Sequence, residues 1–523
     1  MVAKRTVGFA LGGGGARGSF SAGALDYLIR EAGLIPKVIT GTSAGSICAS
    51  VLAQARTSEE FHTAATVLRD DVIRLGVPGV AFEPQPWLTG LEGTPLAVDV
   101  RELMAGTMRP TIPADPTLAE DVLADATSGT RTTAVQHGLE VARSVVSGLA
   151  MTHKAIKGLS ANAESLAVID PLGEALLGHT PGRGPAPLDL ESIARDGLEL
   201  RLTVTALNEG CVRYVTQTGS LVEQDAVTAA PGDPTPGVVE GVLASSSVPM
   251  VFAPRPIGGD VYVDGGVLQN IPLAPAFALG ATDVYAVLAD SLACPPPEVD
   301  YAHTNMFSVL LRSQVYVTLY GQQRRDLAMP RPDGARLTVI DPTVMAIGLF
   351  ETEPGLMNIN IDYGWLRACG ETSKLSDDDR ARAHELADLI VTGRLRAWYL
   401  EHGVAGEIPS DSSVATSPAP ADSEPTDSGP DASKVAASDP ATSKFAGQGA
   451  PESADGVPDA AVWDTDAEAA VPTDAVADEV GIQAARALAS AKRLVAASLV
   501  EWRALGLALP AKDDTWSEQP ELA

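Results

Sequence analysis

The sequence predicts an α/β fold, followed by a disordered acidic tail and a C-terminal helix. Two strand–turn–helix units indicate the fold class. An apolar run at residues 6–11 leads through glycines into a helical pattern at 19–32, and a β-branched run at 37–40 leads through a second glycine turn into a helical pattern at 44–55. A sharp change of composition near residue 406 marks the end of the folded part. We expect one large domain over residues 1–400.

Composition limits the classes of function. The chain has 523 residues and a net charge of -30, which argues against nucleic-acid binding because phosphates would repel it. Its four cysteines form no C-x-x-C pair, so neither a zinc site nor a disulfide framework is predicted. The apolar run near the N-terminus is too short for a signal peptide, and no run is long enough to cross a membrane. We expect a cytoplasmic protein, with peripheral contact at a membrane surface as a further possibility.

The first glycine turn, Gly13-x-Gly15-x-x-Gly18, directly follows the first strand. A strand, a glycine turn and a helix present backbone N–H groups that bind an anion. A dinucleotide site would need an acidic residue at the end of the next strand, and a Walker loop would need lysine where Ser19 stands. The remaining interpretation is an oxyanion hole built from the amides of residues 13–18, including Gly14. Arg17 either adds positive charge there or braces the loop.

The second turn, Gly41-Thr42-Ser43-Ala44-Gly45, is typical of a nucleophile elbow. A serine between strand and helix lies on a strained turn, and flanking glycines remove Cβ atoms that would clash there. The alternative is an ordinary turn in which Thr42 or Ser43 caps the helix. Both turns leave the sheet at the same edge, so Ser43 and the first glycine turn can converge.

A candidate acid follows further along the chain. Strands are predicted at 200–207 and 211–216, joined as a hairpin, then a short helix at 239–247 and a strand at 260–264 that ends in Asp264-Gly265-Gly266. A nucleophilic serine needs a base within hydrogen-bond reach. The seven histidines lie in no recognisable motif. Asp264 is therefore the best-framed candidate for the general base.

These three motifs, in this order, resemble those of the patatin-like phospholipases. The surroundings also match, with Ala244-Ser-Ser-Ser-Val-Pro249 before the acid and Asn270 and Pro272 after it. The resemblance covers residues 5–290, and less closely residues up to 370, with 76–160 as an insertion or lid candidate. It implies a three-layer α/β/α sandwich around a central, mainly parallel sheet. It also implies a Ser43–Asp264 dyad that cleaves acyl esters of phospholipids or glycerolipids without metal or cofactor.

Two other activities remain open. A lipid transacylase would use the same dyad, and a nucleotide-binding oxidoreductase would use the first glycine turn but leaves Asp264-Gly-Gly unexplained.

The remaining segments carry weaker signals. A helix is predicted over 131–159, which either packs on the core or forms a mobile or lipid-facing lid. Helices at 304–327 and 376–399, with a strand at 336–340 between them, complete the domain over 300–400. Residues 406–479 form an acidic low-complexity linker, 480–507 an amphipathic helix and 508–523 a tail. The helix over 480–507 docks on the core, binds a membrane surface or binds a protein partner that the sequence does not identify.

Overall fold

The computed structural model describes residues 5–86, 165–249, 251–293, 309, 312–402 and 473–510. The predicted helix over 131–159, most of the insertion at 76–160, most of the linker at 406–479 and residues 511–523 lie outside the described residues. Every structural statement below concerns the described ranges.

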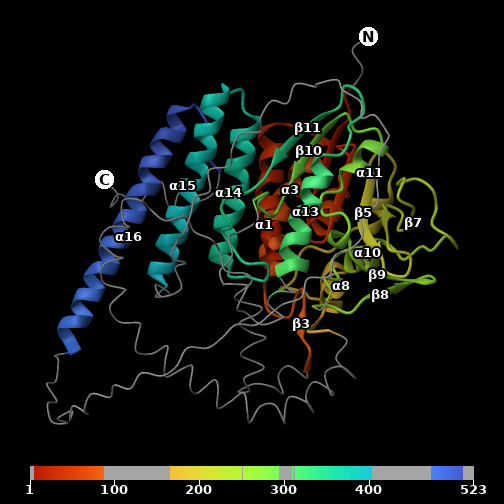
Figure 1. Ribbon diagram of the computed structural model, residues 1–523, viewed down its shortest axis with the longest axis horizontal. Coiled ribbons are helices and arrows are strands. Elements are labelled where there is room, and N and C mark those ends of the chain that lie inside the picture. The colour runs from red at the N-terminus through yellow and green to blue at the C-terminus, as the bar shows by residue number, and fades with distance from the viewer. Residues whose placement is uncertain are drawn as a thin grey trace, which may run out of the picture. The chain divides into compact units, whose positions relative to one another are not determined.

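A mixed, mostly parallel sheet forms the centre of the fold (Figure 1). Its parallel part has the order β11-β10-β1-β2-β5. These strands are β1 (Val7–Leu11), β2 (Val38–Thr42), β5 (Glu199–Ala206), β10 (Asp283–Val287) and β11 (Arg336–Ile340). The antiparallel strands β6 (Cys211–Thr216), β7 (Leu221–Val222), β8 (Arg255–Ile257) and β9 (Asp260–Asp264) extend it beyond β5. A separate pair joins β3 (Glu83–Pro84) to β4 (Ala167–Val168).

Helices cover both faces of this sheet, as alternation along β1 illustrates. Phe9 and Leu11 belong to one apolar cluster, whereas Ala10 between them belongs to another. Successive side chains of a strand point to opposite faces, so the two clusters are the two sides of a three-layer sandwich.

The larger cluster includes residues of α1 (Gly18–Asp26), its π-helical continuation η2 (Tyr27–Glu31), α2 (Ala44–Leu52), α3 (Ser58–Leu75), α8 (Asp170–Leu176), α9 (Leu190–Ala194), α10 (Val238–Ser245) and α14 (Pro354–Thr372). The smaller cluster includes residues of α11 (Leu273–Ala278) and α13 (Thr318–Leu327), the latter preceded by the π-helical η4 (Arg312–Val317). The three-layer α/β/α fold predicted from the sequence is confirmed.

Helices α1 and α14 approach each other through two glycines. A Cβ atom at Gly23 would lie 1.7 Å from the carbonyl oxygen of Ile361, and one at Gly364 would lie 1.9 Å from that of Phe20. Both distances are far below van der Waals contact, so neither position accepts a side chain. This close crossing fixes the helix that carries the first glycine turn.

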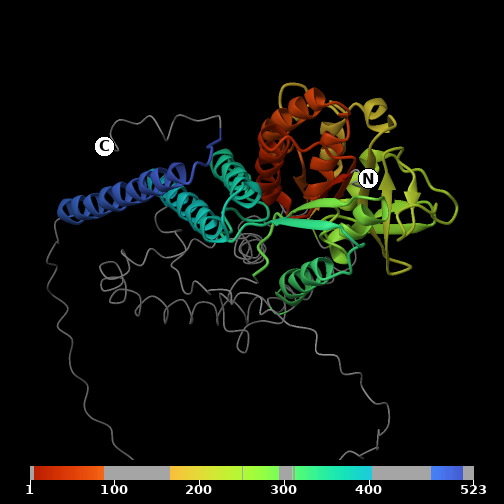
Figure 2. The same cartoon turned by 90° about the horizontal axis from the view of Figure 1, so that it is seen from above.

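Two long helices extend this layer (Figure 2). Helix α15 (Asp377–Glu401) packs on α14, and α16 (Thr473–Ala504) packs on α15. A Cβ atom at Gly393 would lie 2.6 Å from Cγ2 of Val495, and Lys492 pairs with Glu401 at 2.9 Å. Trp502 is fully buried and donates its indole N–H to the carbonyl of Ala508 at 2.7 Å.

Of the three alternatives for the C-terminal helix, the structure therefore shows docking on the core. The helix begins at Thr473, inside the segment predicted as linker. Among the helices described, none combines the length and apolar character that crossing a membrane requires.

Candidate active site

Ser43 lies on a strained turn between β2 and α2. Its backbone has φ 53° and ψ -125°, a conformation that L-residues rarely adopt. Its neighbours permit the turn: a Cβ at Gly41 would lie 2.4 Å from the carbonyl oxygen of Gly45, and one at Gly45 would lie 2.3 Å from that of Leu11. Ser43 precedes the helix but makes no side-chain capping bond. The geometry is that of a nucleophile elbow and not of an ordinary capping turn.

The end of α10 holds the backbones of both Ser43 and Asp264. Ser245 accepts the amide N–H of Ser43 on its hydroxyl at 2.9 Å. The carbonyl of Ser247 accepts the amide N–H of Asp264 at 2.9 Å. One short segment thus sets the distance between the two candidate residues.

Asp264 stands at the end of β9, where the strand leaves the sheet in the short helix η3 (Gly265–Val267). The carboxylate accepts the amide N–H of Gly266 at 2.7 Å and a hydrogen bond from the hydroxyl of Ser43. A Cβ atom at Gly265 would lie 2.4 Å from the carbonyl oxygen of Thr203, so glycine is required for β9 to pass β5 so closely. The structure therefore brings the predicted serine and acid into direct contact.

Burial changes the acidity of this carboxyl group. Removal from water raises the pKa of Asp264 from its ordinary value of 3.8 to about 6, although the hydrogen bonds from Ser43 and Gly266 act in the opposite direction. A carboxylate with a pKa close to neutral is a better proton acceptor than an ordinary aspartate, yet is still mostly ionised at pH 7.

The first glycine turn lies beside Ser43. A Cβ atom at Gly13 would lie 2.9 Å from Cβ of Ser43, so the loop passes directly beside this serine. Gly13 donates its amide to Asn270, and Gly18 donates to carbonyls of its own turn. For the amides of Gly14 and Gly15, no acceptor is found in the described part of the chain.

Arg17 braces this loop. Its guanidinium pairs with Asp290, which is 1% exposed, and also donates to the carbonyl of Ile347 at 3.1 Å. The charge of Arg17 is therefore compensated by a buried carboxylate. Of the two roles predicted for this arginine, the contacts fit the brace.

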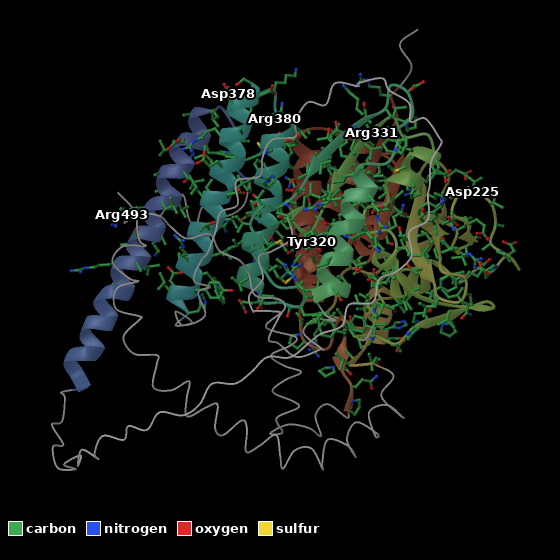
Figure 3. The ribbon with its side chains drawn as sticks, viewed as in Figure 1. Asp225, Tyr320, Arg331, Asp378, Arg380 and Arg493 are labelled. Atoms are coloured by element: carbon green, nitrogen blue, oxygen red, sulfur yellow. The ribbon has the colours of Figure 1, made fainter. Side chains whose placement is uncertain are left out.

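Ser43 and Asp264 both line a cavity of about 580 Å³. Tyr320 of α13, labelled in Figure 3, is one of its lining residues. Apart from the polar groups around Ser43, the lining is mainly apolar and includes Ile47, Val72, Leu75, Ile169, Leu172, Val251, Phe252 and Met357. A site of this size and lining accepts an apolar chain next to a few placed polar groups. None of the described histidines lines the cavity.

Sequence reasoning missed three of these functional contacts. Asn270 and Ser245 were noted as part of a motif but without a role, because their partners lie more than 200 positions away. Asp290 was not noted, although it follows an apolar run at 284–289 that could have been recognised as a buried strand.

Among the comparisons with known proteins, the match to a family model supports this description. A family model described as patatin-like phospholipase matches residues 9–277, just over half of the chain. The crystal structure of VipD from Legionella pneumophila aligns with a TM-score of 0.30 and 13% sequence identity, over 77% of each chain. A search of curated proteins gave no match.

Proposed function

Since this chain belongs to the patatin-like phospholipase family, we propose that it is a serine acyl hydrolase that cleaves fatty-acyl esters of phospholipids or glycerolipids through Ser43 and Asp264. Lipid acyl hydrolysis is the activity of the family in general; the dyad and the substrate are our proposal.

In the first half-reaction, the Ser43 oxygen attacks the ester carbonyl carbon while Asp264 takes the hydroxyl proton. The carbonyl π electrons move to the oxygen, and the amides of Gly14 and Gly15 donate to the resulting oxyanion. The intermediate then collapses, and the bond to the alcohol oxygen breaks. Asp264 returns its proton to that oxygen, so the alcohol leaves neutral and the acyl group stays on Ser43.

The second half-reaction repeats these steps with water. Asp264 takes a proton from the attacking water, the second oxyanion forms in the same place, and the Ser43–acyl bond breaks. The proton then passes to the Ser43 oxygen, which restores the free enzyme and releases the fatty acid. A lipid alcohol in place of water would give transacylation by the same steps.

One observation carries the proposal most strongly. The Ser43 hydroxyl hydrogen-bonds to a buried carboxylate whose pKa is raised to about 6, and both residues line an apolar cavity. A structural serine on a turn would need neither a strained backbone nor a proton acceptor at its hydroxyl. The base, the nucleophile and the space for an acyl chain occur together.

The test measures fatty acid release from a panel of phospholipids and neutral glycerides, with and without an added lipid alcohol. We expect release by the wild type and a loss on the order of a thousandfold or more in Ser43→Ala. Ser58→Ala, at the exposed start of α3, is the matched control and should behave as the wild type. Transfer to the added alcohol would identify a transacylase, and undiminished release by Ser43→Ala would refute the proposed nucleophile.

A further inference from the structure

In the first glycine turn, the amides of Gly14 and Gly15 have no acceptor among the described residues, whereas the other amides are engaged within the protein. Gly12 donates to the carbonyl of Val287 at 2.9 Å, Ala16 to that of Leu349 at 2.8 Å, and Arg17 to that of Gly14 at 3.1 Å. These acceptors are backbone carbonyls. Gly13 differs because its amide donates to a side chain, Oδ1 of Asn270, at 3.2 Å.

The Asn270 carboxamide binds both polar groups of Gly13. Its Nδ2 donates back to the Gly13 carbonyl at 3.5 Å, so one planar side chain pairs with one backbone residue in two directions. The side chain is 3% exposed. A Cβ atom at Gly13 would meet Oδ1 of Asn270 at 2.7 Å and Cβ of Ser43 at 2.9 Å. The carboxamide and Ser43 therefore fill the space beside Gly13 that a side chain would need.

Helix α13 in turn holds the backbone at Asn270. The carboxylate of Asp326 accepts the amide of Ile271 at 3.0 Å and also that of Asn270. On the same helix, Gln322 donates to the carbonyl of Val267. The segment that carries Asn270 is thus tied down on both sides and cannot easily follow the glycine turn if that turn moves.

Asn270 is also close to the candidate base. A point at the Cβ position of Gly266 lies 3.0 Å from Oδ1 of Asn270 and 3.0 Å from Oδ1 of Asp264. The two oxygens are therefore no more than 6.0 Å apart. The uncharged carboxamide thus connects the glycine turn to the acid loop without adding a charge beside Asp264.

We propose that Asn270 is a positioning residue for the acyl-transfer reaction. By binding the Gly13 peptide, its carboxamide directs the neighbouring amides of Gly14 and Gly15 toward the oxyanion that forms at Ser43. This inference rests on the proposed function. It assigns the oxyanion donors to Gly14 and Gly15 and excludes Gly13, whose amide is already engaged.

The experiment compares kcat and KM of wild type, Asn270→Ala, Asn270→Asp and the control Asn208→Ala on one ester substrate. Asn208 lies in the exposed turn between β5 and β6. Each kcat is divided by the fraction of enzyme titrated with a fluorophosphonate, so that unfolded protein does not count. We expect Asn270→Ala to lose about 100-fold in kcat with KM unchanged, which is the typical loss for one oxyanion donor or for a misplacement near 1 Å.

Asn270→Asp separates positioning from a merely structural role. Aspartate keeps an acceptor for the Gly13 amide, so kcat at high pH should recover most of the loss. Its charge lies close to Asp264 and should raise the pKa of that group, which moves the acid limb of the kcat/KM profile to higher pH.

Two results would overturn the inference while Ser43-dependent turnover persists. These are an Asn270→Ala kcat equal to that of Asn208→Ala, and an Asn270→Asp variant as slow as Asn270→Ala with an unshifted pH profile. Failure of the proposed function would give a different result. The wild type would then show either no ester turnover or a turnover that persists in Ser43→Ala.

Discussion

Replacing the buried carboxyl of Asp264 by the carboxamide of Asn should abolish turnover and, at the same time, stabilise the fold at neutral pH. Asparagine has nearly the same shape as aspartate, and its Oδ1 can still accept the amide of Gly266, which donates to Asp264 at 2.7 Å. What disappears is the negative charge, which burial makes unfavourable in the folded state. If the carboxyl group served only to stabilise the fold, its replacement would instead lower stability and leave turnover unchanged.

The size of this stabilisation follows from the pKa of Asp264. Burial raises it from an ordinary 3.8 to about 6. Each factor of ten in proton affinity corresponds to about 1.4 kcal/mol, so the ionised carboxylate costs the folded state about 3 kcal/mol relative to the unfolded chain.

The size of this stabilisation depends on pH. Because the folded pKa is the higher one, the cost is fully present above about pH 6, shrinks as the pH falls, and vanishes below about pH 3, where both states are protonated.

The assay is urea unfolding of wild type and Asp264→Asn at pH 7.5 and pH 4. We expect the variant to be more stable by about 3 kcal/mol at the higher pH and by less than about 1 kcal/mol at the lower. The control is Asp225→Asn in the exposed segment after β7 (Figure 3). Hydrogen bonds from Thr228 and Val227 lower the pKa of Asp225, so this variant should lose stability at neutral pH. Destabilisation by Asp264→Asn at pH 7.5 would refute the reasoning.

Three further predictions concern the pH profile of the reaction, the Arg17–Asp290 pair and the docked C-terminal helix. The kcat/KM profile should rise with pH through a midpoint near 6, because the ionised form of Asp264 is the proposed base; a flat profile between pH 5 and 8 would contradict this assignment. Arg17→Met should lower the free energy of unfolding by about 3–5 kcal/mol by leaving buried Asp290 unpaired, and adding Asp290→Asn should restore part of it in the same urea titration. Trp502→Ala should lower the unfolding midpoint while kcat stays unchanged, as expected for a docked helix; an unchanged midpoint would speak against docking.

The sequence allowed prediction of those parts of the fold whose signals are local. The two strand–turn–helix units, the hairpin of β5 and β6, and strand β9 were all found at or within a few residues of their observed positions. Glycine turns and alternating apolar residues determine such units within a short window, so no distant contact is needed to recognise them.

Several helices of the core were not predicted, and the two long ones, α3 and α14, were missed for different reasons. Helix α3 begins with a complete capping box, in which Thr57 and Glu60 exchange hydrogen bonds, and this signal could have been recognised. Helix α14 offers no such signal. It is buried between α1 and α15, so both Tyr363 and Arg367 are buried and no exposed polar face produces an amphipathic pattern.

The candidate site, like the fold, has features that local sequence signals predict and features that depend on distant contacts. Motif order was enough to predict that Ser43 and Asp264 meet, and the structure places them in contact. The engagement of the Gly13 amide was not predictable, because its acceptor is Asn270, 257 positions away. The compensation of Arg17 likewise depends on Asp290, 273 positions away. Such pairs become visible only in the folded chain.

The most direct test of the Ser43–Asp264 dyad is site-resolved labelling with a fluorophosphonate. The labelled residue is identified by peptide mass spectrometry, and the labelling rate is compared between wild type, Ser43→Ala and Asp264→Asn. The dyad predicts modification of Ser43 in the wild type, none at this peptide in Ser43→Ala, and a rate lower by about a thousandfold in Asp264→Asn, because the base is gone. Modification of a different residue, or an undiminished rate in Asp264→Asn, would contradict the account.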